Sequence, residues 1–89
     1  MDALASIKLY GAARCHKTQY YQLFLDDMGL QYEFLDVEQN EFHAKALCRL
    51  YENGKLNFPT LMIGEKKLRN PSKQELIKWL DKLIPNGNF

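Results

Sequence analysis

The amino-terminal half alternates between a strand, a helix and a second strand, and this alternation limits the fold more than any other feature. Ile7 to Tyr10 is a short apolar strand that ends at Gly11, and Cys15 to Met28 has an amphipathic helical pattern that Gly29 terminates. Gln31 to Val37 is rich in aromatic and branched residues, which favours a strand. Such a strand–helix–strand segment predicts a right-handed crossover with its helix packed on one face of a sheet.

Apolar positions predict which side of each helix is buried. In the first helix one side is shared by Lys17, Tyr21, Phe24 and Met28. Asn40 can cap a second helix, which the Asn53-Gly54 pair ends. The predicted apolar face of that second helix consists of Phe42, Ala46, Leu47, Leu50 and Tyr51.

The carboxyl-terminal half reads as a hairpin followed by a helix. After Phe58-Pro59, the strands Thr60 to Ile63 and Lys66 to Arg69 flank Gly64-Glu65, which suits a two-residue turn. Ser72 and Glu75 form a capping box before an apolar stripe of Leu76, Leu80 and Leu83. The order βαβ-α-ββ-α predicts an α/β fold, with a four-stranded mixed sheet and helices on both faces.

Composition narrows the class of protein. The 89 residues suit a single domain, 1–89, with its core at about 6–84. A net charge of +1 gives no reason to expect nucleic acid as a partner, and the apolar runs are too short for a membrane span. The start, MDALASIKLYG, lacks the pattern of a secretory signal, so we expect a cytoplasmic protein with reduced thiols. The two cysteines are too few for a zinc site, and His16 and His43 do not have zinc-finger spacing.

Cys15 is the strongest candidate for a reactive group. It follows the first strand and begins a helix, where the helix dipole stabilises a thiolate. Arg14 and Lys17 flank it, and His16 adds charge when it is protonated, so the pKa of Cys15 is expected below the usual value of about 8.5. The alternative interpretation is a small buried apolar side chain.

Several segments in this order resemble the glutaredoxin branch of the thioredoxin fold: LYGAARCHKT, QYEFLDV, NFPTLMIGEKKL and NPSKQEL. The resemblance covers about residues 6–84 and implies a thioredoxin-like fold. It also implies that Cys15 is the nucleophile, that Pro59 follows a cis peptide bond, and that the backbone of Phe58 pairs with the substrate thiol. The substrate-binding residues expected with them are Arg14, His16, Lys17 and Ser72.

The chain departs from the family pattern at three places. Thr18 replaces the second cysteine of the C-x-x-C motif, so Cys15 has no resolving thiol three residues on. Arg69-Asn70 replaces a Gly-Gly pair, and the following Pro71 has no backbone N–H for a substrate carboxylate. Ala12 stands where many members have a lysine.

This resemblance implies a monothiol oxidoreductase that removes glutathione from protein mixed disulfides. Glutathione would be a co-substrate, protein thiols and disulfides the partners, and no cofactor or metal would be bound permanently; we expect a monomer. Thr18 would complete the catalytic pair by donating a hydrogen bond to the Cys15 sulfur. Two alternatives remain: a glutathione-ligated dimer that carries an iron–sulfur cluster, and a redox-inactive binding module. A brown colour after anaerobic purification would support the iron–sulfur carrier. Slow alkylation of Cys15 would support the binding module.

Other residues carry weaker predictions. Cys48 is interpreted as a structural or incidental thiol on the second helix, which should lie on the opposite sheet face from Cys15. His43 is expected to be solvated and Trp79 to pack in the last helix. The basic residues Lys66, Lys67, Arg69 and Lys73 fit either a solvated edge strand or a rim that attracts anions.

Overall fold

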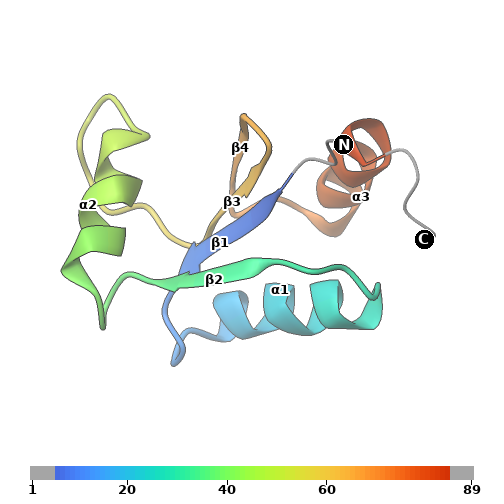
Figure 1. Cartoon of the computed structure of the whole chain (residues 1–89), viewed down its shortest axis with the longest axis horizontal. Coiled ribbons are helices and arrows are strands. Elements are labelled where there is room, and N and C mark those ends of the chain that lie inside the picture. The colour runs from blue at the N-terminus through green and yellow to red at the C-terminus, as the bar shows by residue number, and fades with distance from the viewer. Residues whose placement is uncertain (1–5, 85–89) are drawn as a thin grey trace.

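A computed structural model describes residues 6–84 of the chain (Figure 1). Its sheet has four strands in the order β2-β1-β3-β4. Their bounds are β1 (Ile7–Gly11), β2 (Glu33–Asp36), β3 (Thr60–Ile63) and β4 (Lys66–Arg69). β1 pairs parallel with β2 and antiparallel with β3, and β3 pairs antiparallel with β4. The predicted mixed sheet is therefore confirmed, although β2 is shorter than the predicted Gln31 to Val37.

Within the described residues, three helices cover both faces of this sheet: α1 (His16–Asp27), α2 (Glu41–Arg49) and α3 (Lys73–Leu83). Side chains alternate between the two faces along a strand, so each face has its own core. Leu9 and Ile63 lie in the core that α1 and α3 share, whereas Tyr10 and Leu35 pack with Leu47 of α2. The prediction of helices on both faces is confirmed. Among the described residues, no helix combines the length and apolar character that crossing a membrane requires.

Two of the predicted helix starts have the expected side-chain caps. The Asn40 side chain accepts hydrogen bonds from the backbone N–H groups of Phe42 and His43, and Ser72 accepts one from Glu75 at 3.1 Å. α1 differs from the prediction, because Cys15 is its N-cap and His16 is its first residue. The cysteine therefore directly precedes the first turn of the helix and is not part of that turn.

On each of α1 and α2, one residue of the predicted apolar side is exposed, while the others of that side are buried or partly buried. α1 buries Thr18, Tyr21 and Leu25, while Lys17 is exposed. The helix is rotated because Thr18 packs directly against the strand at Gly11. Phe42 was expected in the core but is 75% exposed, since Leu47 is the buried residue of α2.

Gly11 sets the distance between β1 and α1. A Cβ atom at this position would lie 2.5 Å from Oγ1 and 2.6 Å from Cγ2 of Thr18, which is fully buried. Gly11→Ala is therefore expected to lower the free energy of unfolding by about 1–3 kcal/mol, measured by urea denaturation. Adding Thr18→Ala should recover part of this loss by removing the clash. An unchanged urea midpoint for Gly11→Ala would contradict the expectation.

Candidate functional site

The loop between β1 and α1 presents Cys15 at the carboxyl end of β1. A tight turn closes the loop, since the backbone N–H of Cys15 donates to the carbonyl of Ala12 at 2.9 Å. Gln19 steadies the loop from the helix, where its side-chain Nε2 donates to the carbonyl of Ala13 at 2.8 Å. Cys15 itself is a free, partly exposed thiol. The residue is thus partly accessible from solution.

The surroundings of Cys15 favour the thiolate. The backbone N–H of Thr18 is the largest cause that lowers the pKa of Cys15, and partial burial opposes it. The Thr18 hydroxyl, the Lys17 backbone N–H and the Lys17 ammonium lower the pKa further. The two backbone N–H groups belong to the first helical turn, where backbone donors lack partners within the helix.

Alkylation of Cys15 should therefore have a midpoint below the usual thiol pKa of about 8.5, because the thiolate is the reacting form. The rate of reaction with iodoacetamide against pH measures this directly, in a Cys48→Ser background. The same protein unfolded in urea should give the ordinary midpoint. Because the folded pKa is the lower one, ionisation of Cys15 stabilises the fold above the unfolded pKa. That contribution is lost as the pH falls through the folded pKa. A folded midpoint equal to the unfolded one would refute the prediction.

Thr18 connects the cysteine loop to the helix. Its side chain is fully buried, and its Oγ1 accepts a hydrogen bond from the backbone N–H of Ala12 at 3.3 Å. The hydroxyl still has its own proton to donate, and it lowers the pKa of Cys15, although the Cys15 sulfur accepts no capping hydrogen bond at the start of α1. The structure thus brings together Cys15 and Thr18, the two residues predicted as a catalytic pair.

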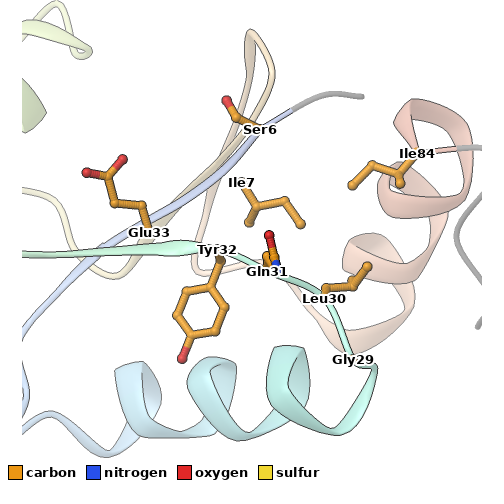
Figure 2. A pocket seen from close by; sticks show the side chains of 8 residues that line it. All are labelled: Ser6, Ile7, Gly29, Leu30, Gln31, Tyr32, Glu33 and Ile84. Atoms are coloured by element: carbon orange, nitrogen blue, oxygen red, sulfur yellow. The ribbon is translucent and has the colours of Figure 1, made fainter. Parts of the chain in front are cut away.

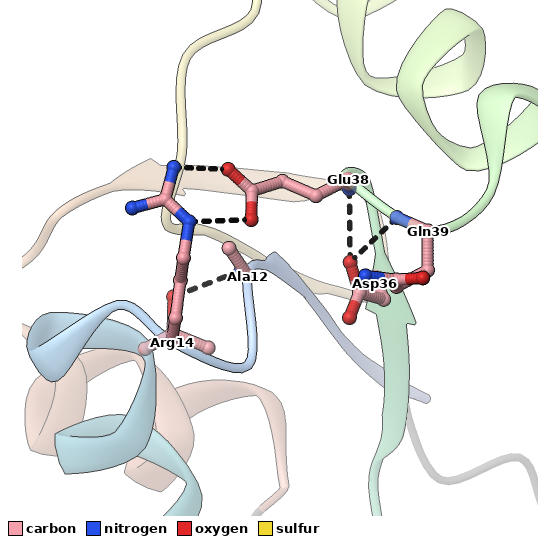
Figure 3. A network of polar contacts seen from close by, with 6 residues as sticks. Ala12, Arg14, Asp36, Glu38 and Gln39 are labelled. Carbon is pink, nitrogen blue, oxygen red and sulfur yellow. Dashed lines mark hydrogen bonds and ion pairs between the residues drawn. The ribbon is translucent and has the colours of Figure 1, made fainter.

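Arg14 is held by an acidic residue that the sequence reasoning did not include. Its Nε donates to Oε1 of Glu38 at 2.9 Å, and its Nη2 donates to Oε2 of the same carboxylate (Figure 3). Glu38 follows β2, which runs parallel to β1, so the residues after both strands meet at one edge of the sheet. Because Glu38 directly follows the predicted strand Gln31 to Val37, the same argument would have placed it near the cysteine loop.

The Phe58-Pro59 peptide bond is cis, which confirms the expectation that the family resemblance implied. Pro59 is buried and Phe58 is half-buried against the core beneath α2. The carbonyl of Pro59 accepts a hydrogen bond from the backbone N–H of Asn70 at 3.0 Å. The proline loop is therefore tied to the loop between β4 and α3.

Tyr21 joins α1 to that same loop, a connection absent from the sequence predictions. Its hydroxyl donates to the carbonyl of Pro71 and lies 3.2 Å from Oδ1 of Asn70. Asn70 has a φ of +48°, a left-handed conformation that asparagine tolerates better than most residues. Burial is the main cause that raises the pKa of Tyr21 to about 12.

Replacing Tyr21 with phenylalanine should lower the free energy of unfolding by about 1–3 kcal/mol, because the buried Pro71 carbonyl loses its donor. The raised pKa adds a pH signature. The contribution of neutral Tyr21 is complete below about pH 10 and is lost as the pH rises through about 12. Urea denaturation at several alkaline pH values should therefore show a steeper loss of stability in the parent than in Tyr21→Phe. Parallel curves would argue against this role for the hydroxyl.

The remaining predicted binding residues lie at the surface. His16, Lys17 and Ser72 are exposed, and Ser72 also caps α3. Two of the four basic residues near the hairpin contact aromatic rings. Lys66 lies 4.2 Å from the ring centre of Trp79, and Lys67 lies 4.1 Å from that of Tyr51.

Three sequence expectations concern residues away from Cys15, namely Cys48, His43 and Trp79. Cys48 is a free, half-buried thiol on α2, on the opposite sheet face from α1, as expected. His43 was expected to be solvated, but it is half-buried at the start of α2. Its Nδ1 has no hydrogen-bond partner within the described part of the chain. Trp79 packs partly against the core, as predicted.

A hollow of about 600 Å³ lies away from Cys15, at the amino end of β1 (Figure 2). Ile7, Leu30 and Ile84 point into it, and Glu33 lies at its border. None of the predicted site residues lines this hollow. Between residues 6 and 84, no three potential ligands from histidine, cysteine and acidic residues gather as a metal site would require.

Comparison with solved structures identifies the fold. The thioredoxin-like protein BC3987 superposes with a TM-score of 0.70 at 22% identity, over 82% of this chain and 97% of that one. The glutaredoxin from Archaeoglobus fulgidus superposes with a TM-score of 0.69 at 20% identity, over 92% of this chain and 88% of its own. The buckwheat glutaredoxin–glutathione complex gives 0.69 at 15% identity, over 91% of this chain and 77% of its own. No protein-family model and no curated protein sequence matches the chain. The chain thus has the thioredoxin-like fold that the family resemblance implies.

Proposed function

We propose that this protein is a monothiol oxidoreductase that exchanges disulfides through the thiolate of Cys15, with glutathione mixed disulfides as substrates. The observation that carries the proposal is a free, partly exposed thiol whose pKa is lowered at the start of α1. The similarity to glutaredoxins, one of them in complex with glutathione, supports the same chemistry and the same substrate class.

The reaction needs one enzyme thiol. The Cys15 thiolate attacks the glutathionyl sulfur of a mixed disulfide, a new disulfide forms between Cys15 and glutathione, and the protein thiolate leaves. A second glutathione thiolate then attacks the glutathionyl sulfur on Cys15. Oxidised glutathione leaves, and the Cys15 thiolate is restored. Glutathione is thus consumed as a reductant, and no permanently bound cofactor is required.

Each neighbouring residue has a role in this proposal. Thr18 donates its hydroxyl proton toward the sulfur, and the backbone of Phe58, before Pro59, lies along the bound substrate. His16 and Lys17 offer exposed positive charge or hydrogen bonds to an anionic substrate. Ser72 already accepts a bond from the N–H of Glu75, so its hydroxyl proton remains available. We expect the protein to act as a monomer on protein disulfides in a reducing compartment such as the cytoplasm.

Incubation with oxidised glutathione followed by intact mass measurement and peptide mapping tests the proposal. One glutathionyl group on Cys15, removed again by reduced glutathione, is the expected result. An adduct on Cys48 in place of Cys15 would show that Cys15 is not the nucleophile. No adduct on either cysteine would favour the redox-inactive binding module.

A further inference from the structure

The ion pair between Arg14 and Glu38 is not needed to close the loops that carry it. The cysteine loop is closed by the bond from Cys15 to the carbonyl of Ala12. The loop after β2 is closed by Asp36, whose Oδ1 accepts from the backbone N–H groups of Glu38 and Gln39 at 2.9 and 3.0 Å (Figure 3). Both loops therefore keep their backbone bonds if the ion pair opens.

The two partners of the ion pair differ in how firmly they are held. The side chain of Glu38 is 28% exposed and extends from the loop that Asp36 organises, whereas the side chain of Arg14 is 79% exposed. An exposed arginine side chain has many accessible rotamers and little packing to restrain it. Arg14 is thus the partner that can move while Glu38 stays in place.

Arg14 lies close enough to Cys15 to act on what binds there. It directly precedes the cysteine. Its pKa is raised mainly by the hydrogen bond to Glu38 and by the charge of that carboxylate, with a smaller contribution from the charge of Cys15. A disulfide whose sulfur contacts Cys15 therefore brings a nearby carboxylate within reach of the guanidinium. Arginine binds carboxylates through two parallel N–H donors, which here are occupied by Glu38.

We propose that Arg14 binds a carboxylate of the disulfide substrate, and that Glu38 competes with this carboxylate as an internal substitute for it. This inference rests on the proposed function and deepens it. Arg14 is the docking cation, Glu38 is a specificity-determining residue, and the favoured substrates are disulfides with a carboxylate near the reacting sulfur. Because Glu38 must be displaced first, the preference for anionic over neutral disulfides is weaker than it would be if Arg14 were unpaired.

The test compares two disulfides that react with the same Cys15 thiolate. Oxidised glutathione carries carboxylates, and bis(2-hydroxyethyl) disulfide is neutral. The ratio of their second-order rate constants with reduced protein cancels any change in the intrinsic reactivity of Cys15. We expect Glu38→Gln to raise this ratio about fivefold, as for loss of an exposed ion pair, and Arg14→Gln to lower it. In an Arg14→Gln background, Glu38→Gln should change the ratio by less than about twofold.

Glu41→Gln is the matched control, since Glu41 is an acidic residue just beyond the same loop and pairs with Lys45 at 3.9 Å. An equal rise of the ratio in Glu41→Gln would show that the loss of any nearby negative charge has this effect, and it would overturn the inference. So would a Glu38→Gln protein that reacts more slowly with both disulfides and unfolds at lower urea, because the pair would then be a structural clamp. An unchanged ratio in Glu38→Gln refutes the competition between Glu38 and the substrate carboxylate, but it does not refute the proposed function. If the parent reacts with neither disulfide, the proposed function fails, and this inference fails with it.

Discussion

Cys15→Ser is expected to abolish glutathione-dependent disulfide exchange, with a loss of at least about a thousandfold in turnover. A serine hydroxyl is not ionised near neutral pH and cannot form the mixed disulfide, so no part of the cycle remains. Turnover of a glutathionylated peptide by reduced glutathione measures the effect. Because Cys15 is partly exposed at a helix start, the change should leave the urea midpoint nearly unaltered.

Cys48→Ser is the matched control for this experiment. Cys48 lies on α2, and the sheet separates that helix from α1. A disulfide needs Cα atoms within about 7 Å, which elements on opposite sheet faces exceed. Cys48→Ser should therefore retain turnover within about twofold. A folded Cys48→Ser protein without turnover would show that Cys48 takes part in the reaction.

The parts of the fold that local rules govern could be predicted from the sequence. Asn40 and Ser72 cap their helices through side chains that reach only two or three residues onward, so the sequence alone carries the signal. The hairpin around Gly64 is equally local, and its glycine has the expected positive φ. Cys15 could be singled out for the same reason, since the start of the helix that it caps lowers the pKa of its thiol.

The parts that depend on contacts between distant residues could not be predicted in this way. The rotation of α1 is set by the contact between Thr18 and Gly11, which exists only after the helix docks on β1. Arg14 and Glu38 are 24 residues apart, and they meet because two parallel strands end at one edge. Helical periodicity also placed Phe42 in the core, although the apolar face of α2 reaches the sheet mainly through Leu47.

Thr18→Cys is expected to change the mechanism from monothiol to dithiol. Residues one helical turn apart face the same side, so a cysteine at position 18 would lie beside Cys15 and could form a disulfide with it. After mild oxidation the variant should be two hydrogen atoms lighter and inert to alkylation at both positions, as mass measurement shows. The parent should keep a Cys15 adduct until an external thiol removes it, because a hydroxyl cannot resolve a mixed disulfide.

The buried position of Thr18 predicts what this change costs and supplies its control. Sulfur accepts hydrogen bonds weakly, so the Ala12 N–H would lose most of its bond to Oγ1, at about 1 kcal/mol of stability. Thr18→Ser keeps the hydroxyl and should remain a monothiol protein whose turnover depends on glutathione. A Thr18→Cys protein that folds but forms no internal disulfide would show that the two side chains do not meet. If the parent instead closes a disulfide of its own under mild oxidation, then Cys48 reaches Cys15 and the monothiol mechanism is wrong.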